Sequence, residues 1–545
     1  MLALLRTVVA NRDLRRLQFA WAASTISSFA YVVGLAVISY RTAGTTGVGV
    51  LMAARMVVAA IASPLTASLA DSRPARAVMA GSDLARAVLL LMLAAAAQRG
   101  SAWAVLLVLA ATVAVAVTPF RPAQAALLPA LAGTPEELTA SNAIASTVES
   151  VGVFAGPAVG GLLLAAGSPA AVFLFCAGLA VVSAALVVTV REPARDRSEG
   201  GDHDQGGHRL TAGIRLLASS RDLAAVVSVY AVQALAAGAL GVYIVVVAID
   251  LLHTGNAGVG YLDAAIGVGG VLGGVAAAGL ATGGRVALAF GGGVAIWGVG
   301  MALVAASSST AVTLSLLAVV GIGNTIVDVG AVTLLQRSAP EAVLGRVFGA
   351  LESILLAALG VGAIAGPALI AALSVRGALV VTGLALPLSA VVVWRRLARL
   401  DRVPAELEQR IALLAASPIF APLARPMLEQ LARRLKPLRV AAGDVVVRRG
   451  DPGDRFYVVA AGELSVDTGS GPAPPLRAGD VFGEIALLHD VPRTATITAR
   501  AACDLLALDR GEFLAAVTGN PRSAAEADMI ASARLGSLRP SVSAI

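Results

Sequence analysis

The sequence predicts an α-helical membrane protein with twelve spans in two six-helix bundles, followed by a C-terminal α+β domain that contains a β-roll. One observation is composition: of 545 residues, 57% are hydrophobic and only 14% are charged, against about 25% charged in an ordinary soluble domain. The other is where the charges lie. Residues 1–403 hold 25 basic and 18 acidic side chains, whereas the much shorter segment 404–545 holds 16 of each. A hydrophobic part therefore precedes a soluble, electrically neutral part.

Apolar runs long enough to cross a bilayer, which takes about 20 residues, begin near residues 17, 46, 76, 103, 138, 169, 222, 257, 285, 310, 343 and 377. The first is too long for the core of a cleaved signal peptide, so we expect it to be retained. With the N-terminus in the cytoplasm, nineteen arginines fall inside and three, Arg41, Arg99 and Arg376, outside. This positive-inside bias predicts a multi-pass plasma-membrane protein with both termini cytoplasmic. It also accounts for the net charge of +7 without a nucleic-acid partner.

The longest polar gap of the hydrophobic part, residues 191–210, divides the spans six and six. The two halves correspond at an offset of about 210 residues, most clearly at three positions: Gly152, Gly156 and Pro157 match Gly362, Gly366 and Pro367. Two bundles related in this way support rocking about a central site. The predicted segments are a first bundle at 1–190, a cytoplasmic linker at 191–220, a second bundle at 221–397, a linker at 398–412, the soluble domain at 413–535 and a tail at 536–545.

One motif in a loop and one motif in a span resemble those of a known family, and the resemblance covers roughly residues 1–400. The loop SLADSRPARAVMAG resembles the gating signature of the major facilitator superfamily, with Asp71 and Arg76 kept and Ser72 and Pro74 departing from it. The span GVFAGPAVGG is similar to the motif of members that export by antiport, through Gly152, Gly156, Pro157, Gly160 and Gly161. Close helix packing at small residues explains these glycines equally well. The resemblance implies the fold of that superfamily and extends to its branch of drug and siderophore exporters.

Four ionisable residues at bilayer depth are candidates for proton or substrate binding, because a charge there costs about 2.5–3.5 kcal/mol on insertion scales. Glu149 and Asp328 are expected near mid-membrane, where burial lets a carboxylic acid exchange a proton near neutral pH. Arg55 and Arg121 either bind an anionic substrate or neutralise Glu149, and both alternatives stay open. Candidates for hydrogen bonds to a substrate are Gln233, Asn324 and Gln336. A structural ion pair near a cytoplasmic helix end is expected for Asp83 and Arg86.

The soluble part has short β-prone runs separated by glycines. The runs DVVVRR, RFYVVA, ELSVDT, TATITA and DLLALD lie between residues 437 and 508 and predict a small antiparallel β-roll. Helical spacing of Leu407, Ile411 and Leu414 predicts a short amphipathic helix before the roll, and helical residues return from about 510 to 535.

Inside the β-roll, GDVFGEIALLHDVPRTAT at residues 479–496 resembles the phosphate-binding cassette of cyclic-nucleotide-binding domains along its full length. The resemblance covers about residues 413–535. It implies that Gly483 permits close backbone approach, that Glu484 accepts from the ribose 2′-OH and that Arg493 binds the cyclic phosphate by bidentate hydrogen bonds. Further implied contacts come from the short helix after Gly483 and from a hydroxyl: Ile485, Ala486 and Thr494. The alternative is a β-roll that keeps the fold without binding.

The last helix, with Met529, Ile530 and Leu535, is the expected lid over the base. The sequence leaves the choice between cAMP and cGMP open, and likewise the oligomeric state.

Together these patterns predict a secondary active transporter, a proton-coupled exporter of a small organic molecule regulated by cytoplasmic cAMP or cGMP. The alternatives are a non-transporting, membrane-anchored cyclic-nucleotide receptor and a lipid flippase on the same fold. An enzyme is not expected, because the single lysine, Lys436, lies in no phosphate-binding motif and no G-x-S-x-G occurs. Two cysteines and four scattered histidines predict no metal site and no cofactor. A DNA-binding motif is not expected in the ten residues after the lid, and no TVGYG filter of a channel occurs.

Overall fold

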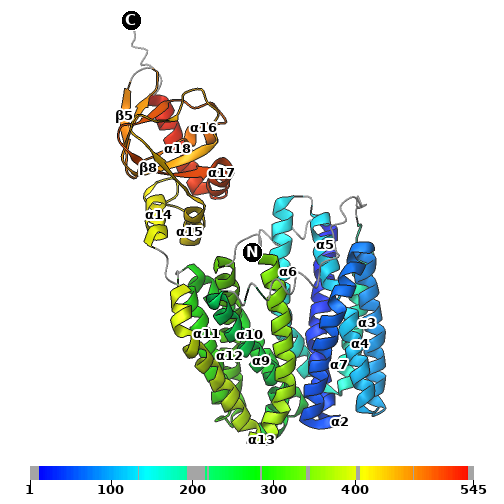
Figure 1. Ribbon diagram of the computed structural model, residues 1–545. Coiled ribbons are helices and arrows are strands. Elements are labelled where there is room, and N and C mark those ends of the chain that lie inside the picture. The colour runs from blue at the N-terminus through cyan, green and yellow to red at the C-terminus, as the bar shows by residue number, and fades with distance from the viewer. Residues whose placement is uncertain are drawn as a thin grey trace. The chain divides into compact units, whose positions relative to one another are not determined.

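The computed structural model describes residues 11–132, 134–192, 215, 217, 220–282, 285–338, 344–400, 405–469 and 472–537. The chain divides into two compact units (Figure 1): one comprises Met1–Ala281 and Arg285–Asp401, and the other comprises Arg402–Ile545. The charge-poor part of the sequence thus forms one unit and the charge-rich part the other.

The first unit is helical throughout its described residues. Its helices are α2 (Arg12–Ser72), α3 (Ala75–Gln98), α4 (Trp103–Val117), α5 (Phe120–Leu131), α6 (Pro135–Ala166), α7 (Pro169–Val188), α9 (Arg221–Val246), the π-helix η1 (Val247–Leu251), α10 (Gly255–Thr282), α11 (Val286–Val304), α12 (Thr310–Ser338) and α13 (Leu344–Leu400). Among the described residues, ten helical segments are long and apolar enough to cross a membrane. The chain is a multi-pass membrane protein.

Two of these helices are interrupted by sharp kinks. The backbone leaves helical geometry at Ala43 and Gly44 in α2 and at Ser374 in α13. Gly44 has a φ of 62°, a left-handed conformation that glycine adopts without steric strain. Each kink therefore reverses the chain between two long apolar stretches.

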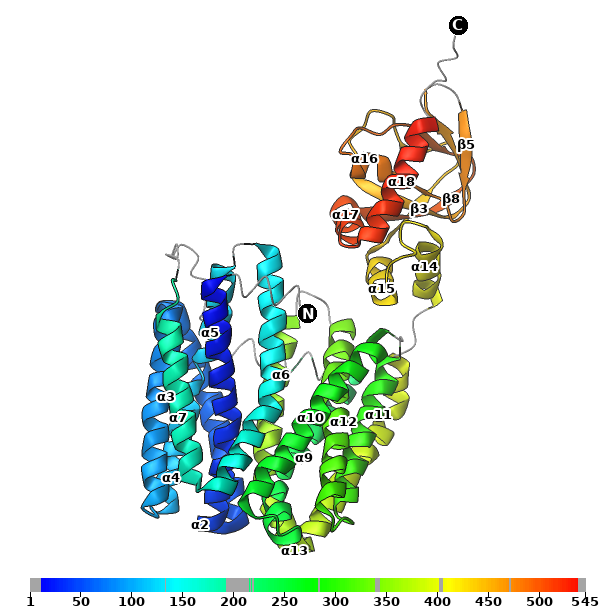
Figure 2. The ribbon, with the colours of Figure 1, turned by 180° about the vertical axis from the view of Figure 1, so that it is seen from behind.

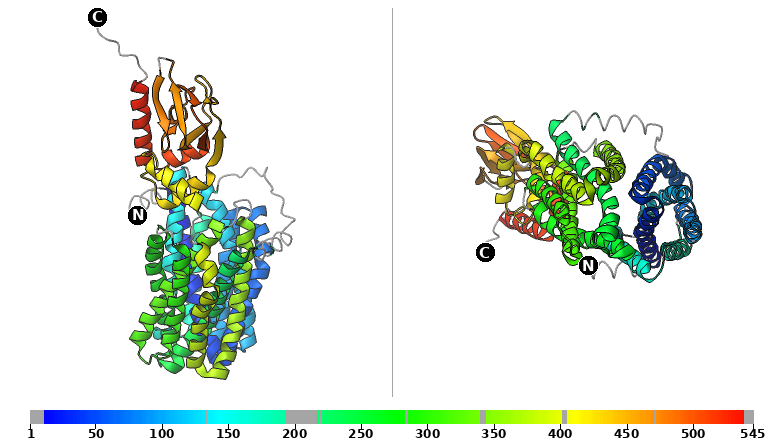
Figure 3. Two further views of the ribbon diagram at one scale, coloured as in Figure 1. Left: turned by 60° about the vertical axis from the view of Figure 1, so that its left-hand side comes forward. Right: turned by 90° about the horizontal axis from the view of Figure 1, so that it is seen from below.

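Helices α2 to α7 lie on one side of this unit and α9 to α13 on the other (Figures 2 and 3). Backbones of the two groups touch at glycines. A Cβ atom on Gly49 of α2 would lie 2.3 Å from the Ala363 oxygen of α13, and one on Gly260 of α10 would lie 2.5 Å from the Cα of Gly161 in α6. Small residues are required for such close helix contact. The groups therefore meet where side chains are absent.

The second unit contains a β-roll of two antiparallel four-stranded sheets, ordered β1-β8-β3-β6 and β2-β7-β4-β5. Its elements are α14 (Ala405–Ala416), α15 (Arg425–Arg434), β1 (Lys436–Val440), β2 (Val445–Val447), β3 (Arg455–Ala461), β4 (Glu463–Asp467), β5 (Pro472–Arg477), β6 (Val481–Phe482), α16 (Glu484–Leu488), β7 (Thr496–Ala499), β8 (Cys503–Asp509), α17 (Arg510–Thr518) and α18 (Pro521–Ser537). The five predicted β-prone runs contain β2, β3, β4, β7 and β8. The predicted β-roll is confirmed.

Strand β3 separates two hydrophobic cores. Its side chains alternate, so that Phe456 and Val458 pack with the helices while Tyr457 and Val459 pack between the sheets. On the helical side, the Phe456 ring stacks on Phe513 at a centroid distance of 4.6 Å. An apolar run without alternation, RFYVVA, is what a strand buried on both faces requires.

The predicted amphipathic helix is confirmed as α14, in which Leu407, Ile411 and Leu414 bury their side chains in the helical core. It begins at Ala405, inside the segment 398–412 that is predicted to be a linker. Strands β1, β5 and β6 lie outside the predicted β-prone runs. Strand β5 was not predicted, since its sequence is PAPPLR and proline lacks the N–H that a sheet uses. It is tolerated because β5 pairs only with β4, at the edge of its sheet.

Candidate functional site

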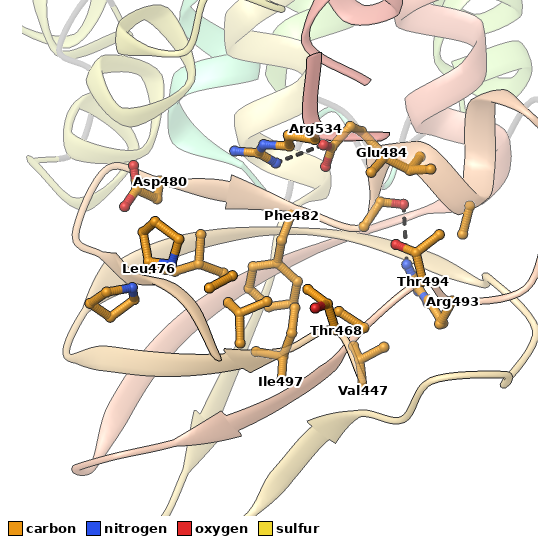
Figure 4. A pocket seen from close by; sticks show the side chains of 18 residues that line it. Val447, Thr468, Leu476, Asp480, Phe482, Glu484, Arg493, Thr494, Ile497 and Arg534 are labelled. Atoms are coloured by element: carbon orange, nitrogen blue, oxygen red, sulfur yellow. Dashed lines mark hydrogen bonds and ion pairs between the residues drawn. The ribbon is translucent and has the colours of Figure 1, made fainter. Parts of the chain in front are cut away.

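A cavity of about 400 Å³ in the second unit lies beside the β-roll and α16 (Figure 4). All the residues predicted to contact a nucleotide line it: Gly483, Glu484, Ile485, Ala486, Arg493 and Thr494. The rest of the lining is largely apolar and includes Val447, Leu476 and Ile497. A cavity with a few convergent polar groups on apolar walls is typical of a small-molecule site.

The backbone at Gly483 shapes one wall of this cavity. Gly483 has a φ of 94° and precedes the first residue of α16. A Cβ atom there would lie 2.6 Å from Nη1 of Arg493 and 2.9 Å from the carbonyl oxygen of Arg455. Glycine is therefore needed for both conformation and space. The amides of the first turn of α16 have no partner within the helix and can donate to a ligand.

We expect Gly483→Ala to destabilise the isolated second unit more than Gly479→Ala. Gly479 has a nearly identical φ of 95° but nothing within 4 Å of its Cβ position, so both variants carry about 1–2 kcal/mol of conformational strain. Only Gly483→Ala adds overpacking, worth about 1–3 kcal/mol. Urea unfolding of residues 405–545, followed by circular dichroism, measures the difference. Equal losses in the two variants would show that Arg493 moves aside freely.

The guanidinium of Arg493 is held in place by β3 and by Gly483. The side chain is 4% exposed, and it donates to the carbonyls of Arg455 at 2.7 Å and Gly483 at 3.1 Å and to Asp454 at 3.2 Å. It also lies 5.8 Å from the ring centroid of Tyr457. Burial, together with the Asp454 carboxylate, raises the pKa of Tyr457 against the opposing charge of Arg493. The cation is thus buried, oriented and only partly neutralised.

The carboxylate of Glu484 has one oxygen occupied and one open. Glu484 is 1% exposed, and its Oε1 accepts from Nη1 of Arg534 at 2.6 Å. Its Oε2 is buried and has no hydrogen-bond partner among the described residues. Arg534 lies on α18, and its bond to Glu484 is drawn in Figure 4. Arg534 also donates to the carbonyl of Val481 at 2.8 Å. The carboxylate is therefore oriented by Arg534 and keeps an acceptor free.

The sequence predicts apolar lid residues on the last helix and does not predict that Arg534 lines the site. Arg534 is the α18 side chain that lines the cavity, whereas Met529 is 59% exposed and Ile530 packs on the helical core. Met529, Ile530 and Leu535, the predicted lid residues, do not line the cavity, and their role as a lid stays a prediction. The sequence holds no signal that singles out Arg534, because a basic residue in the last turn of a helix is common.

In the first unit, the exporter-like glycines of α6 serve helix packing. A Cβ on Gly152 would lie 2.4 Å from Thr25 Cγ2, and one on Gly156 would lie 2.5 Å from Phe29 Cβ, both in α2. The remaining residues of the motif are Pro157, inside α6, Gly160, against α2, and Gly161, against α10.

The gating-like loop is only partly described. Arg76 is exposed, and its Nη1 donates to the carbonyl of Val190 at 3.3 Å. The carboxylate of Glu192 accepts from the amides of Ala75 and Arg76 at 2.9 and 3.1 Å. These contacts fasten the start of α3 to the end of α7. The side chain of Asp71 lies outside the described part of the chain.

Glu149 pairs with Arg121 and not with Arg55. The Nη2 of Arg121 and the Oε2 of Glu149 are 3.2 Å apart, and the two side chains are 71% and 39% exposed. Glu149 is therefore not enclosed, contrary to the expectation of a buried acid. The sequence could not show this, because Arg121 lies on another helix, α5.

Asp328 is the acceptor at the end of a polar chain between α9 and α12. Its Oδ1 accepts from the Tyr230 hydroxyl at 2.8 Å, and its Oδ2 accepts from Nδ2 of Asn324 at 2.9 Å. Gln233 donates to Oδ1 of Asn324 at 2.6 Å. With both oxygens accepting, the geometry is that of an ionised carboxylate. Gln233 and Asn324 were predicted as substrate contacts, but Tyr230 was not predicted. Gln336 is exposed.

Comparison with known proteins identifies both parts of the chain. The profile of the Major Facilitator Superfamily matches residues 19–355, and that of the cyclic nucleotide-binding domain matches residues 437–520. A cyclic nucleotide-gated potassium channel from Mesorhizobium japonicum is 39% identical over 113 residues, 21% of this chain and 31% of the channel. The acetyltransferase Pat from Mycolicibacterium smegmatis is 42% identical over 96 residues, 17% of this chain and 29% of the relative.

Solved structures also match part of the chain. The cAMP co-crystal structure of the regulatory domain of Toxoplasma gondii PKA has 23% identity and a TM-score of 0.22, and it covers 24% of this chain and 50% of that one. The chain spans less than a third of the length of the two curated relatives.

Proposed function

This chain belongs to the Major Facilitator Superfamily and carries a cyclic nucleotide-binding domain, and from that premise we propose that it is a secondary transporter regulated by cAMP or cGMP. The observation that carries the regulatory part is that Arg493 and Glu484 line one cavity of about 400 Å³. The guanidinium provides bidentate donors for a cyclic phosphate. The open Oε2 of Glu484 is an acceptor for the ribose hydroxyl.

Calorimetry on residues 405–545 with cAMP and with cGMP tests the sensor directly. We expect saturable binding of at least one of them with one site per chain. If the domain binds neither nucleotide, it is a β-roll that keeps the fold without binding, and the regulatory proposal is wrong.

The same fragment tests how Arg534 acts. Because Arg534 occupies Oε1 and leaves Oε2 open, it orients the carboxylate toward the ribose. We expect Arg534→Leu to weaken nucleotide binding about tenfold, the loss of one charge-assisted hydrogen bond. Arg522→Leu on the same helix, α18, is the matched control and should bind as the unaltered domain does. Tighter binding by the Arg534 variant would show instead that this arginine competes with the ligand.

For the carrier part, we place twelve spans in two six-helix bundles, counting α2 and α13 twice at their kinks, with both termini on the cytoplasmic side of the plasma membrane. Glycine contacts between α2 and α13 and between α6 and α10 support rocking of the two halves. The Tyr40 hydroxyl of α2 donates to Asp250 of η1, which joins the halves near the kink of α2. We propose that the protein exports its substrate in exchange for protons and that Asp328 binds and releases the proton. Its partners Tyr230 and Asn324 hold the ionised form.

Regulation requires that nucleotide binding changes the carrier equilibrium. Helix α13 ends at Leu400 and α14 begins at Ala405, so the connection between the two units is short. A coupling free energy of about 1–3 kcal/mol between two binding sites is typical. If nucleotide changes the affinity for substrate by some factor, substrate must change the affinity for nucleotide by the same factor. Turnover of the reconstituted protein with and without nucleotide measures it. Equal turnover in both conditions favours a membrane-anchored receptor.

A further inference from the structure

Helix α3 carries a buried cation and anion that balance each other. Asp83 and Arg86 are each 1% exposed, and Ser24 of α2 joins them: its hydroxyl donates to Asp83 at 3.3 Å and accepts from Nη1 of Arg86 at 3.2 Å. Nη2 of Arg86 donates to Ser27 at 2.8 Å. This is the expected structural pair, but Arg86 lies near the middle of α3 (Ala75–Gln98) and not at a helix end. Arg86 therefore has an acidic neighbour, joined to it through Ser24.

Arg55 of α2, by contrast, has no acidic partner among the described residues. Its guanidinium lies 4.9 Å from the ring centroid of Tyr31, and its nearest recorded acceptor is the weakly accepting sulfur of Met52 at 3.5 Å. Arg121 takes the one carboxylate, Glu149, that the sequence offered to Arg55.

The depth of Arg55 makes this charge costly. Arg55 follows Gly44, at the kink of α2, by eleven residues, about 16 Å of helix. Tyr31 precedes the kink by twelve residues, so that both side chains lie near the middle of a hydrocarbon core about 30 Å thick. A cation at this depth normally has a counter-charge or belongs to a substrate path.

Hydrogen-bonding atoms without a partner around Arg55 also indicate a binding site. Nε of Arg55 and the hydroxyl of Tyr31 are buried without a hydrogen-bond partner among the described residues, and Tyr31 is only 3% exposed. Arg55 itself is half-buried, so part of its surface is accessible. Buried donors without acceptors are costly unless a ligand satisfies them.

We propose that Arg55 and Tyr31 bind the anionic group of the transported molecule, which makes the substrate an organic anion. This assignment rests on the proposed transport function. The opposite half offers hydrogen-bonding groups around Asp328 and no recorded cation in that network. An anionic group is therefore the chemistry that Arg55 fits, and a carboxylate matches the guanidinium fork.

The test is thermal unfolding of the full-length protein purified in detergent, followed by intrinsic fluorescence. The ligands are benzoate, salicylate and 1-naphthoate, each compared with its neutral amide at equal ionic strength. We expect at least one acid to raise the melting temperature by several degrees, as a ligand specific for the folded state does. Its amide should have no effect. Amides that stabilise as well as the acids, or no response to any acid, would overturn the proposal.

Variants separate a binding role from a structural one. In Arg55→Gln the acid-dependent shift should vanish, while Arg55→Lys should keep part of it and Arg121→Gln all of it. Without acid, Arg55→Gln should unfold in one cooperative transition, which shows that the variant is folded. An acid-dependent shift that persists in Arg55→Gln contradicts a substrate role. cAMP added to the same samples reports on the sensor, so that failure of nucleotide regulation and failure of the anion site give different results.

Discussion

Replacing Arg493 by alanine is expected to lower the affinity of residues 405–545 for cyclic nucleotide by about 100-fold or more, roughly 3 kcal/mol. A bidentate contact to phosphate comprises two charge-assisted hydrogen bonds, and a buried guanidinium makes them in a medium of low dielectric constant. Arg493 is 4% exposed. Calorimetry measures the dissociation constant, and Arg493→Lys should fall between alanine and the unaltered domain because lysine lacks the planar fork.

The control for this variant has to separate binding from folding. Arg493 also fastens Gly483 and Arg455, so the alanine variant will lose some stability, which its thermal unfolding curve measures. Arg500→Ala removes an exposed arginine that pairs with Glu463 at 2.9 Å. An exposed pair contributes little, so nucleotide affinity should stay as it is. A folded Arg493→Ala domain with unaltered affinity would show that the phosphate binds elsewhere in the cavity.

Replacing Asp328 by asparagine should reduce substrate-linked proton movement in proteoliposomes to background, at least tenfold below the unaltered carrier. Asparagine preserves the shape and can still accept from Tyr230, but it cannot bind and release a proton. An entrapped pH-sensitive dye follows the protons, and labelled substrate follows exchange. Exchange of labelled for unlabelled substrate, which needs no net proton movement, should persist because the two halves can still rock.

Glu149→Gln is the companion to this variant. Since Glu149 is 39% exposed and paired with Arg121, its neutralisation should affect proton movement less than the change at Asp328. Proton movement that is unchanged in both variants would remove both acids from the mechanism. A larger loss in Glu149→Gln would reverse their assignment.

Some of the fold and site could be predicted because the signals are local. The β-prone runs predicted β2, β3, β4, β7 and β8, and the nucleotide cassette lies in one continuous stretch, 479–496. A turn such as that at Gly483, with a φ of 94°, is encoded by its own residue and immediate neighbours. The prolines of β5 were a misleading local signal, since the edge position that tolerates them depends on the whole sheet.

The amino-acid order alone determined that a hydrophobic multi-pass part is joined to a soluble β-roll with a phosphate-binding cassette, because hydropathy, alternation and turn chemistry act over short distances along the chain. Only the tertiary structure decided which charges are paired. Glu149 meets Arg121 from 28 residues away, Glu484 meets Arg534 from 50 and Asp328 meets Tyr230 from 98. Helix packing determines the partner of a buried charge, and among the described residues it leaves Arg55 without an acidic partner.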